Sequence, residues 1–140
     1  MPARDLYHDA VKTALVKDGW TITHDPLTLR WGRKDLFVDL GAEKLLAAEK
    51  AGRRIAVEIK SFLGRSEVED LKNALGQYIL YRDIMSELES EKDRELYLAV
   101  PRAVSADLFE EPVGRLPIEK GHLRLLVFDA DKEEIVRWIP

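Results

Sequence analysis

The 140-residue sequence contains no cysteine, which excludes disulfide bonds and metal sites built from thiolates. It has no apolar run near the ~18 residues that a membrane-spanning helix requires. Its first residues carry no apolar core of a signal peptide. Internal repeats and low-complexity tracts are absent as well. We therefore expect a cytoplasmic protein without membrane contact, formed by a single domain over residues 1–140.

The chain has fewer positive than negative side chains. It contains 22 lysines and arginines and 26 aspartates and glutamates, which gives a net charge of −4. This balance excludes the broad basic surface of a protein that coats nucleic acid. A nuclease is still compatible with it, since nuclease contacts are local and partly mediated by metal ions.

Hydrophobic periodicity predicts an α/β fold with a mixed sheet and a helical crossover. An apolar stripe of helical spacing predicts a first helix over residues 5–18, with Asp5 as its N-cap. Ser66 and Glu69 form a capping box at the start of a long helix. Apolar or alternating segments predict strands at residues 20–23, 27–29, 36–40, 54–62, 96–100, 123–128 and 134–138.

The remaining segments connect these elements. Residues 45–48 fit a strand in a hairpin that turns at residues 50–53, and they also fit a helical turn. The glycine-containing turn before a strong strand favours the hairpin. Ser105 is a suitable cap for a short helix to about residue 110, and residues 111–122 are interpreted as a loop.

The strand over residues 54–62 carries two charged side chains on one face. Glu58 and Lys60 are two residues apart, so they point to the same side of a strand. A carboxylate-x-lysine triplet occurs twice in the chain, and chance alone predicts roughly two. The second triplet, at residues 70–72, lies in the long helix, where positions two apart diverge. Only the strand triplet therefore places both groups together.

Two other elements supply partners for Glu58. Asp39 ends an earlier predicted strand and is positioned beside Glu58. Gln77 and Tyr81 are four residues apart and share one face of the long helix. Two separate elements therefore converge on the strand that carries Glu58.

This combination indicates a metal-dependent phosphodiesterase site. Mg²⁺ takes carboxylate, carbonyl and water oxygens, so Asp39, Glu58 and the Ile59 carbonyl are the candidate ligands. Lys60 would orient or deprotonate the attacking water, or neutralise developing charge. Gln77 would position the phosphate or a water, and the Tyr81 side chain would pack beside it or touch the nucleic-acid backbone.

Simpler interpretations stay open. A solvated strand face with a weak ion pair would also explain Glu58 and Lys60. Ordinary helix surface and core would explain Gln77 and Tyr81. A surface location is favoured for His8, because nothing in the sequence pairs it.

Other charged and aromatic residues have two interpretations. Glu43 or Glu49 could replace Asp39 as a ligand, since oxygen ligands are needed near a point and not at one sequence position. A small basic cluster at residues 30–34, which also contains Trp31, could contact phosphates or a partner. A solvated face and a core tryptophan are the favoured interpretations there.

These residues resemble two known nuclease motifs. Asp39 with residues 58–60 resembles the PD-(D/E)xK motif, with Val38 in the place of the proline. Residues 77–81 resemble the QxxxY motif of its RecB-like branch. The resemblance implies a restriction-endonuclease-like fold, a mixed central sheet flanked by helices, with Mg²⁺ or Mn²⁺ as cofactor and DNA as substrate. RecB-like nucleases often carry a histidine near the N-terminus, which makes His8 a further candidate.

Nearly the whole chain is similar to the XisH family, the cyanobacterial fdxN-element excision controlling factors. The similarity is carried by residues 4–8, 19–26, 38–43 and 55–62. It implies a role in programmed excision of a DNA element, alongside a site-specific recombinase and a partner called XisI. Nucleases of this fold often pair to cut two strands, which implies a homodimer.

We therefore expect a controlling factor for programmed site-specific excision of a DNA element, with a Mg²⁺-dependent DNA endonuclease site as the leading interpretation of its chemistry. The alternative is a non-catalytic adaptor that binds XisI or the recombinase on a nuclease-like scaffold. The net negative charge favours the adaptor, because tight DNA binding requires neutralised phosphates.

Overall fold

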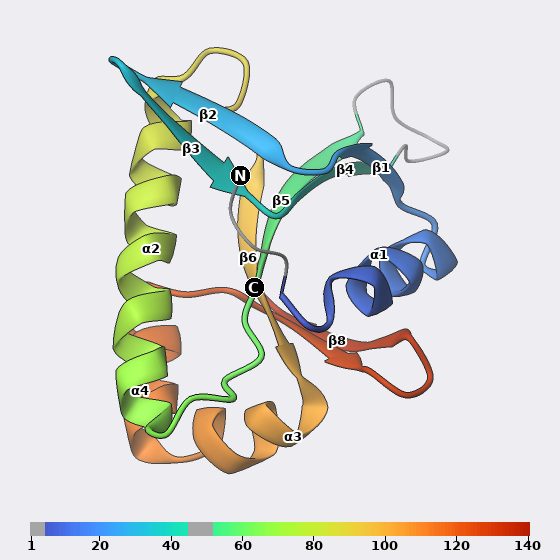
Figure 1. The fold of residues 1–140 in the computed structure, drawn as a ribbon, viewed down its shortest axis with the longest axis vertical. Coiled ribbons are helices and arrows are strands. Elements are labelled where there is room, and N and C mark those ends of the chain that lie inside the picture. Colours follow the sequence, from blue (N-terminus) through green and yellow to red (C-terminus); the bar gives the residue numbers. More distant parts are fainter. Residues whose placement is uncertain (1–4, 45–51) are drawn as a thin grey trace.

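A central sheet with helices on both faces organises the structure, a computed structural model that describes residues 5–44 and 52–140 (Figure 1). The strands are β1 (Thr21–His24), β2 (Leu27–Trp31), β3 (Lys34–Val38), β4 (Leu40–Lys44), β5 (Arg53–Ile59), β6 (Glu95–Pro101), β7 (Leu125–Asp129) and β8 (Glu134–Ile139). The helical elements are α1 (His8–Lys17), α2 (Glu67–Glu87), α3 (Arg102–Val104), a π-helical turn (Ser105–Phe109) and α4 (Pro112–Glu119).

The sheet has six strands in the order β1-β4-β5-β6-β7-β8, and β2 and β3 form a separate two-stranded ribbon. β5, β6 and β7 are parallel neighbours, whereas the other three pairs are antiparallel. The parallel step from β5 to β6 is made through α2, as the predicted helical crossover requires. The prediction of a mixed α/β fold is confirmed.

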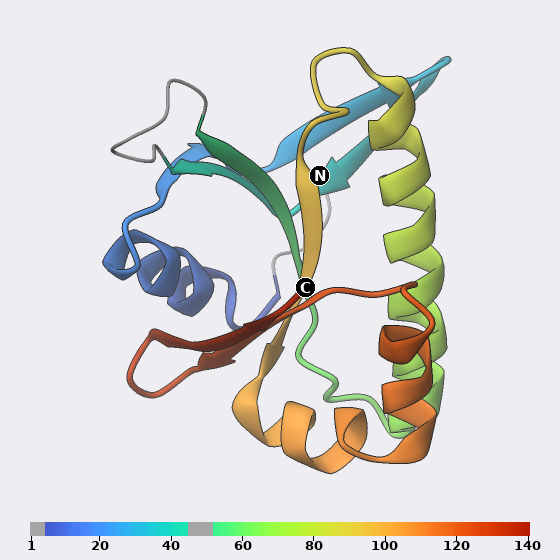
Figure 2. The same ribbon diagram turned by 180° about the vertical axis from the view of Figure 1, so that it is seen from behind.

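The central sheet, with β5 inside it, divides the core into two layers, and α1 and α2 lie on opposite sides of the sheet (Figures 1 and 2). Ile55, Val57 and Ile59 pack in the cluster that contains α1. Ala56, between them, packs in the cluster that contains α2. The strand alternation predicted from the sequence is therefore present, and β5 is buried on both faces.

The single strand predicted over residues 36–40 is wrong. Val38 ends β3 and pairs with Leu27 of the ribbon, whereas Leu40 begins β4 and pairs with Val57 of β5. Asp39 stands between the two strands, at a bend. Both apolar neighbours are buried, but in different layers, so the local alternation could not reveal that the chain changes sheets there.

Helix α1 begins at His8, three residues later than predicted, and Asp5 does not cap it. The Asp5 carboxylate instead accepts the Tyr7 N–H at 2.9 Å and the Ser61 N–H at 3.0 Å. The long helix agrees with its predicted start, since Ser66 Oγ accepts the Glu69 N–H at 3.2 Å.

The predicted loop at residues 111–122 is also wrong, because α4 occupies most of it. Pro112 stands in the first turn, where its missing N–H has no consequence. Gly114 allows close approach to the preceding turn, since a Cβ there would overlap the carbonyl oxygen of Leu108. Prolines and a glycine in a short segment favour a loop by composition. Here the packing of the segment against the preceding turn stabilises a helix instead.

One of the two predicted hairpins is confirmed, whereas the predicted strand of the other is not described. β4 and β5 pair antiparallel, although residues 45–51, which contain the predicted strand at 45–48, lie outside the described residues. β7 and β8 form the predicted C-terminal hairpin. Within the described residues, no helix combines the length and the apolar composition that crossing a bilayer requires.

Candidate functional site

The candidate site forms where the chain passes from strand β3 of the ribbon to strand β4 of the central sheet. Leu40, the first residue of β4, pairs with Val57, so the register leaves Ile59 without a β4 partner. Val38 would stand opposite Ile59, but it belongs to the ribbon. Asp39 lies in this gap, and its Oδ2 accepts the Ile59 N–H at 2.7 Å. The carboxylate thereby takes the hydrogen bond that a neighbouring strand would otherwise accept.

Glu58 lies against Asp39, and these two side chains form the carboxyl pair of the site. Glu58 is 9% exposed, and its Oε1 accepts the backbone N–H of Asp39 at 3.2 Å. Burial, then the negative charge of Asp39 and a hydrogen bond between the two side chains, raise the pKa of Glu58 to about 9. Glu58 therefore retains its proton at neutral pH.

Lys60 follows β5 directly, beside this pair. Its backbone N–H donates to the Ala99 carbonyl at 3.0 Å, which extends the parallel ladder by one bond. Its positive charge lowers the pKa of Glu58, against the larger effect of burial. The Lys60 ammonium is therefore close enough to influence the pair electrostatically.

Tyr81 reaches the pair from helix α2, whereas Gln77 does not. Burial raises the pKa of Tyr81 to about 12, with additional contributions from the negative charges of Glu58 and Asp39. The phenol therefore stays protonated and is available as a hydrogen-bond donor. Gln77 lies one turn earlier on α2 and is exposed. Within the described residues, no hydrogen bond joins Gln77 to either carboxyl group.

His8 is buried, so its predicted surface location is wrong. It is 4% exposed, and its Nε2 lies 2.6 Å from Asp25 Oδ1. Lys12 Nζ lies 2.8 Å from the other oxygen of Asp25. Burial raises the pKa of Asp25, but hydrogen bonds with Lys12 and His8 outweigh it and lower the pKa overall. No local pattern could indicate this group, because Asp25 lies 17 residues after His8 and outside helix α1.

Glu43, one of the two alternative acidic ligands, lies away from the pair. Glu43 lies near the far end of β4, where it pairs with Arg54, whose Nε is 3.5 Å from Glu43 Oε1. Glu49 lies outside the described residues. In residues 5–44 and 52–140, no group of three or more carboxylate or imidazole side chains could hold a metal. A cation at this site would thus rely on two carboxylates and backbone or solvent oxygens.

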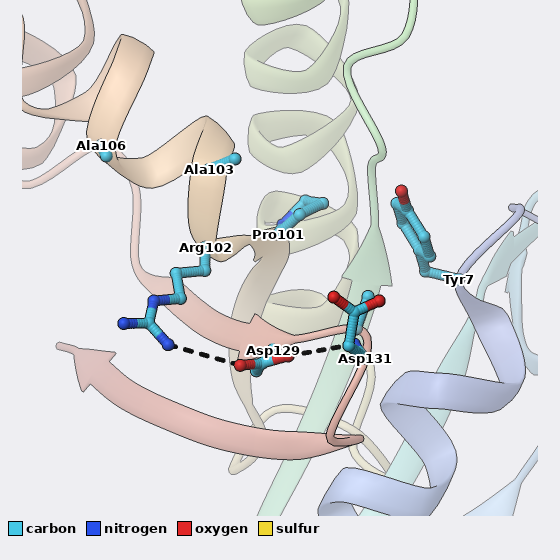
Figure 3. A pocket seen from close by; sticks show the side chains of 8 residues that line it. Tyr7, Pro101, Arg102, Ala103, Ala106, Asp129 and Asp131 are labelled. Carbon is cyan, nitrogen blue, oxygen red and sulfur yellow. Dashed lines mark hydrogen bonds and ion pairs between the residues drawn. The ribbon is translucent and has the colours of Figure 1, made fainter.

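A surface pocket of about 530 Å³ is lined by residues other than the carboxyl pair (Figure 3). Tyr7, Arg102, Asp129 and Asp131 are among its lining residues, at the carboxyl ends of β6 and β7. Arg102 Nη1 lies 3.3 Å from Asp129 Oδ2, and the Asp131 N–H donates to Asp129 Oδ1 at 3.0 Å. Arg102 is therefore already paired with Asp129 in this pocket, and neither Asp39 nor Glu58 lines it.

Asp5 and Asp25 are the acidic residues near the site that sequence reasoning missed. Asp5 binds the N–H of Ser61, directly after Lys60. Asp25 follows His24, which pairs with Gly41, so it lies beside the bend that carries Asp39. No local signal could find them, because the partner of Asp5 is 56 residues away along the chain.

The fold and the site together define a class: a mixed α/β protein in which two carboxyl side chains meet where a strand leaves the central sheet. The family model described as XisH protein matches residues 1–136. The chain therefore belongs to the XisH family. Among proteins with curated functions, none matches the chain.

Two solved structures share the whole fold. One is an XisH family protein from Nostoc punctiforme PCC 73102, with 39% identity and a TM-score of 0.85 over 97% of this chain and 100% of that one. The other is an fdxN element excision controlling factor protein from Anabaena variabilis, with 41% identity and a TM-score of 0.84 over 98% of this chain and 100% of that one.

Proposed function

We propose that this protein is a controlling factor for programmed site-specific excision of a DNA element, built on a restriction-endonuclease-like fold with a PD-(D/E)xK-type endonuclease site. The name of the Anabaena variabilis relative, an fdxN element excision controlling factor, supports the role in excision control. The observation that carries the nuclease part is the contact of Asp39 with the buried Glu58, in which Glu58 accepts the Asp39 N–H and Asp39 accepts the Ile59 N–H.

The donor set at this pair fits a hard divalent cation. Asp39 and Glu58 supply carboxylate oxygens. The Ile59 carbonyl points to the same side of β5 as the Ile59 N–H that Asp39 accepts. The raised pKa of Glu58 reflects two acidic groups forced together in a buried place. A cation bound there would replace the retained proton and remove the repulsion.

Mg²⁺ or Mn²⁺ at this position would lower the pKa of a coordinated water and stabilise negative charge on a phosphate. The chain contributes the groups around it. Lys60 would orient that water or neutralise the phosphate, and the protonated hydroxyl of Tyr81 would donate a hydrogen bond to a phosphate oxygen. Gln77 is exposed on the same helix and available to bound DNA. His8 would act indirectly, by fixing Asp25 beside the bend.

The direct test is cleavage of supercoiled and linear DNA with Mg²⁺ or Mn²⁺ and with a chelator. We expect metal-dependent nicking or cutting that disappears in Glu58→Ala and in Lys60→Ala. Glu87→Ala, an exposed change at the end of α2, serves as the matched control and should cleave normally. If calorimetry detects no metal binding and both site variants still support wild-type excision in cells, the nuclease proposal is wrong.

A second candidate function is a non-catalytic adaptor for an XisI-type partner or the site-specific recombinase. The net charge of −4 favours it. So does an apolar groove between α2 and α4, where Val68, Val113 and Leu116 are about half exposed. Stable co-purification of the partner, together with no DNA affinity at low salt, would support the adaptor over the nuclease. We also propose a homodimer, which sedimentation analysis of the same sample would test.

A further inference from the structure

The tip of the β2–β3 ribbon, residues 30–35, carries charge opposite to that of the whole chain. It contains three cations and one carboxylate. Asp35 Oδ1 pairs with Arg30 Nη1 at 3.2 Å. The other two cations, Arg33 and Lys34, are exposed and form no ion pair within the described residues. This ribbon tip thus holds two uncompensated positive charges on a protein of net charge −4.

The local sequence explains why the ribbon tip projects. Trp31 pairs with Lys34, so only Gly32 and Arg33 join the two strands. Gly32 has a φ of 62°, and a glycine at the first of two central positions fits a type II′ turn. Fully buried Leu29 anchors the base against the layer of α2. Beyond this anchor, the ribbon tip extends past the end of α2 (Figures 1 and 2).

Trp31 differs from the other two tryptophans of the chain. It is 47% exposed, whereas Trp20 and Trp138 pack against each other with ring centroids 5.7 Å apart. An exposed aromatic beside unpaired cations is the combination with which proteins stack on bases or wedge between base steps. A two-stranded ribbon also fits the major groove, which is about 12 Å wide.

We propose that the ribbon tip is a contact site for double-stranded DNA. Arg33 and Lys34 bind phosphates, and Trp31 packs against the exposed edges of the bases in a groove. The positive charge of the ribbon tip is local, which reconciles DNA binding with an acidic protein. The assignment does not require catalysis, because binding by the ribbon tip needs no metal.

The ribbon also connects the tip to the carboxyl pair. Lys34 begins β3, and Asp39 follows its last residue. Five residues at about 3.3 Å each separate the ribbon tip from Asp39 by roughly 17 Å, the length of about five base-pair steps. One duplex could therefore contact both places. This connection, unlike the contact itself, rests on the proposed function.

The experiment measures binding of a fluorescent duplex of about 30 base pairs, without divalent metal, over a range of salt concentrations. Arg33→Ala/Lys34→Ala removes the two unpaired cations. Arg115→Ala/Lys120→Ala removes one cation from α4 and one from the residue after it, at the other end of α2. Trp31→Ala removes the aromatic ring, whereas Trp31→Phe replaces the indole by a smaller aromatic ring, so the two variants show whether binding requires an aromatic side chain. Thermal unfolding of each variant confirms that it is folded.

We expect the ribbon-tip double variant to weaken binding about 10-fold or more at low salt and to lower the salt-dependence slope by about two. The α4 double variant should bind like the wild type. Trp31→Ala should weaken binding at least about 5-fold, with partial rescue in Trp31→Phe. No duplex binding by the wild type, equal losses in both double variants, or tighter binding of single strands would overturn the proposal.

The same assay separates this inference from the nuclease proposal. Glu58→Gln should fail to cleave the duplex, because Glu58 belongs to the proposed metal site. Loss of cleavage in Glu58→Gln therefore tests the carboxyl pair. Loss of binding in Arg33→Ala/Lys34→Ala tests the ribbon tip, whatever the outcome for cleavage.

Discussion

Replacing Glu58 by glutamine should make the unfolding free energy of the metal-free protein less dependent on pH. The folded state holds a proton on Glu58 until about pH 9, whereas an unfolded glutamate releases it near the ordinary value of 4.5. Between these values the folded state binds more protons than the unfolded state. The stabilisation from this proton is fully present below about pH 4.5 and is lost as pH rises toward 9.

The magnitude follows from the width of this window. Each pH unit inside it costs about 1.4 kcal/mol of stability for one retained proton. Raising the pH from 5 to 8 should therefore cost the wild type at most about 4 kcal/mol through Glu58. Glu58→Gln keeps an oxygen that can accept the Asp39 N–H and has no proton to release. At pH 8 the metal-free variant should thus be the more stable protein.

Urea unfolding at four pH values between 5 and 8, with a chelator present, measures this difference directly. Glu87→Gln, an exposed change in α2, should follow the wild-type slope. Parallel slopes for the wild type and Glu58→Gln would refute the assignment of the retained proton to Glu58. The proposed metal site adds an opposite effect: Mg²⁺ or Mn²⁺ should stabilise the wild type at pH 8, by about 2.7 kcal/mol at 100 times Kd, and should not stabilise Glu58→Gln.

Two further pairs of variants test the packing that supports the site. Gly114→Ala should destabilise the protein by roughly 1–3 kcal/mol, because its methyl group meets the Leu108 carbonyl. Gly76→Ala, with open space around its Cβ, should stabilise the protein by about 0.5–1 kcal/mol; equal effects in urea unfolding would contradict this reasoning. Tyr78→Phe should cost about 1–3 kcal/mol, because the hydroxyl donates to Leu96 O at 2.7 Å and accepts the Arg124 N–H at 3.2 Å. Tyr97→Phe should cost clearly less, because the bond that the Tyr97 hydroxyl donates to Glu95 Oε2 is longer, at 3.4 Å, and a larger loss there would count against the argument.

The strands and the long helix were predictable because their signals are local. Ile55, Val57 and Ile59 alternate with Ala56 and Glu58 at the strand period, and the two sets pack in different layers. Local chemistry also decides the start of α2, through the side-chain oxygen of Ser66. Where composition and tertiary contact disagreed, as in α4, the local signal failed.

Local sequence patterns were enough to predict most of the sheet-forming segments, the shared face of Glu58 and Lys60, and the family. The contact of Asp39 with Glu58 could not be predicted in this way, because it depends on the change from the ribbon to the central sheet between Val38 and Leu40. The tertiary structure also decided that His8 is buried against Asp25. These contacts join residues far apart in the chain, and their energies depend on burial and on neighbouring charges, which exist only after the layers have packed.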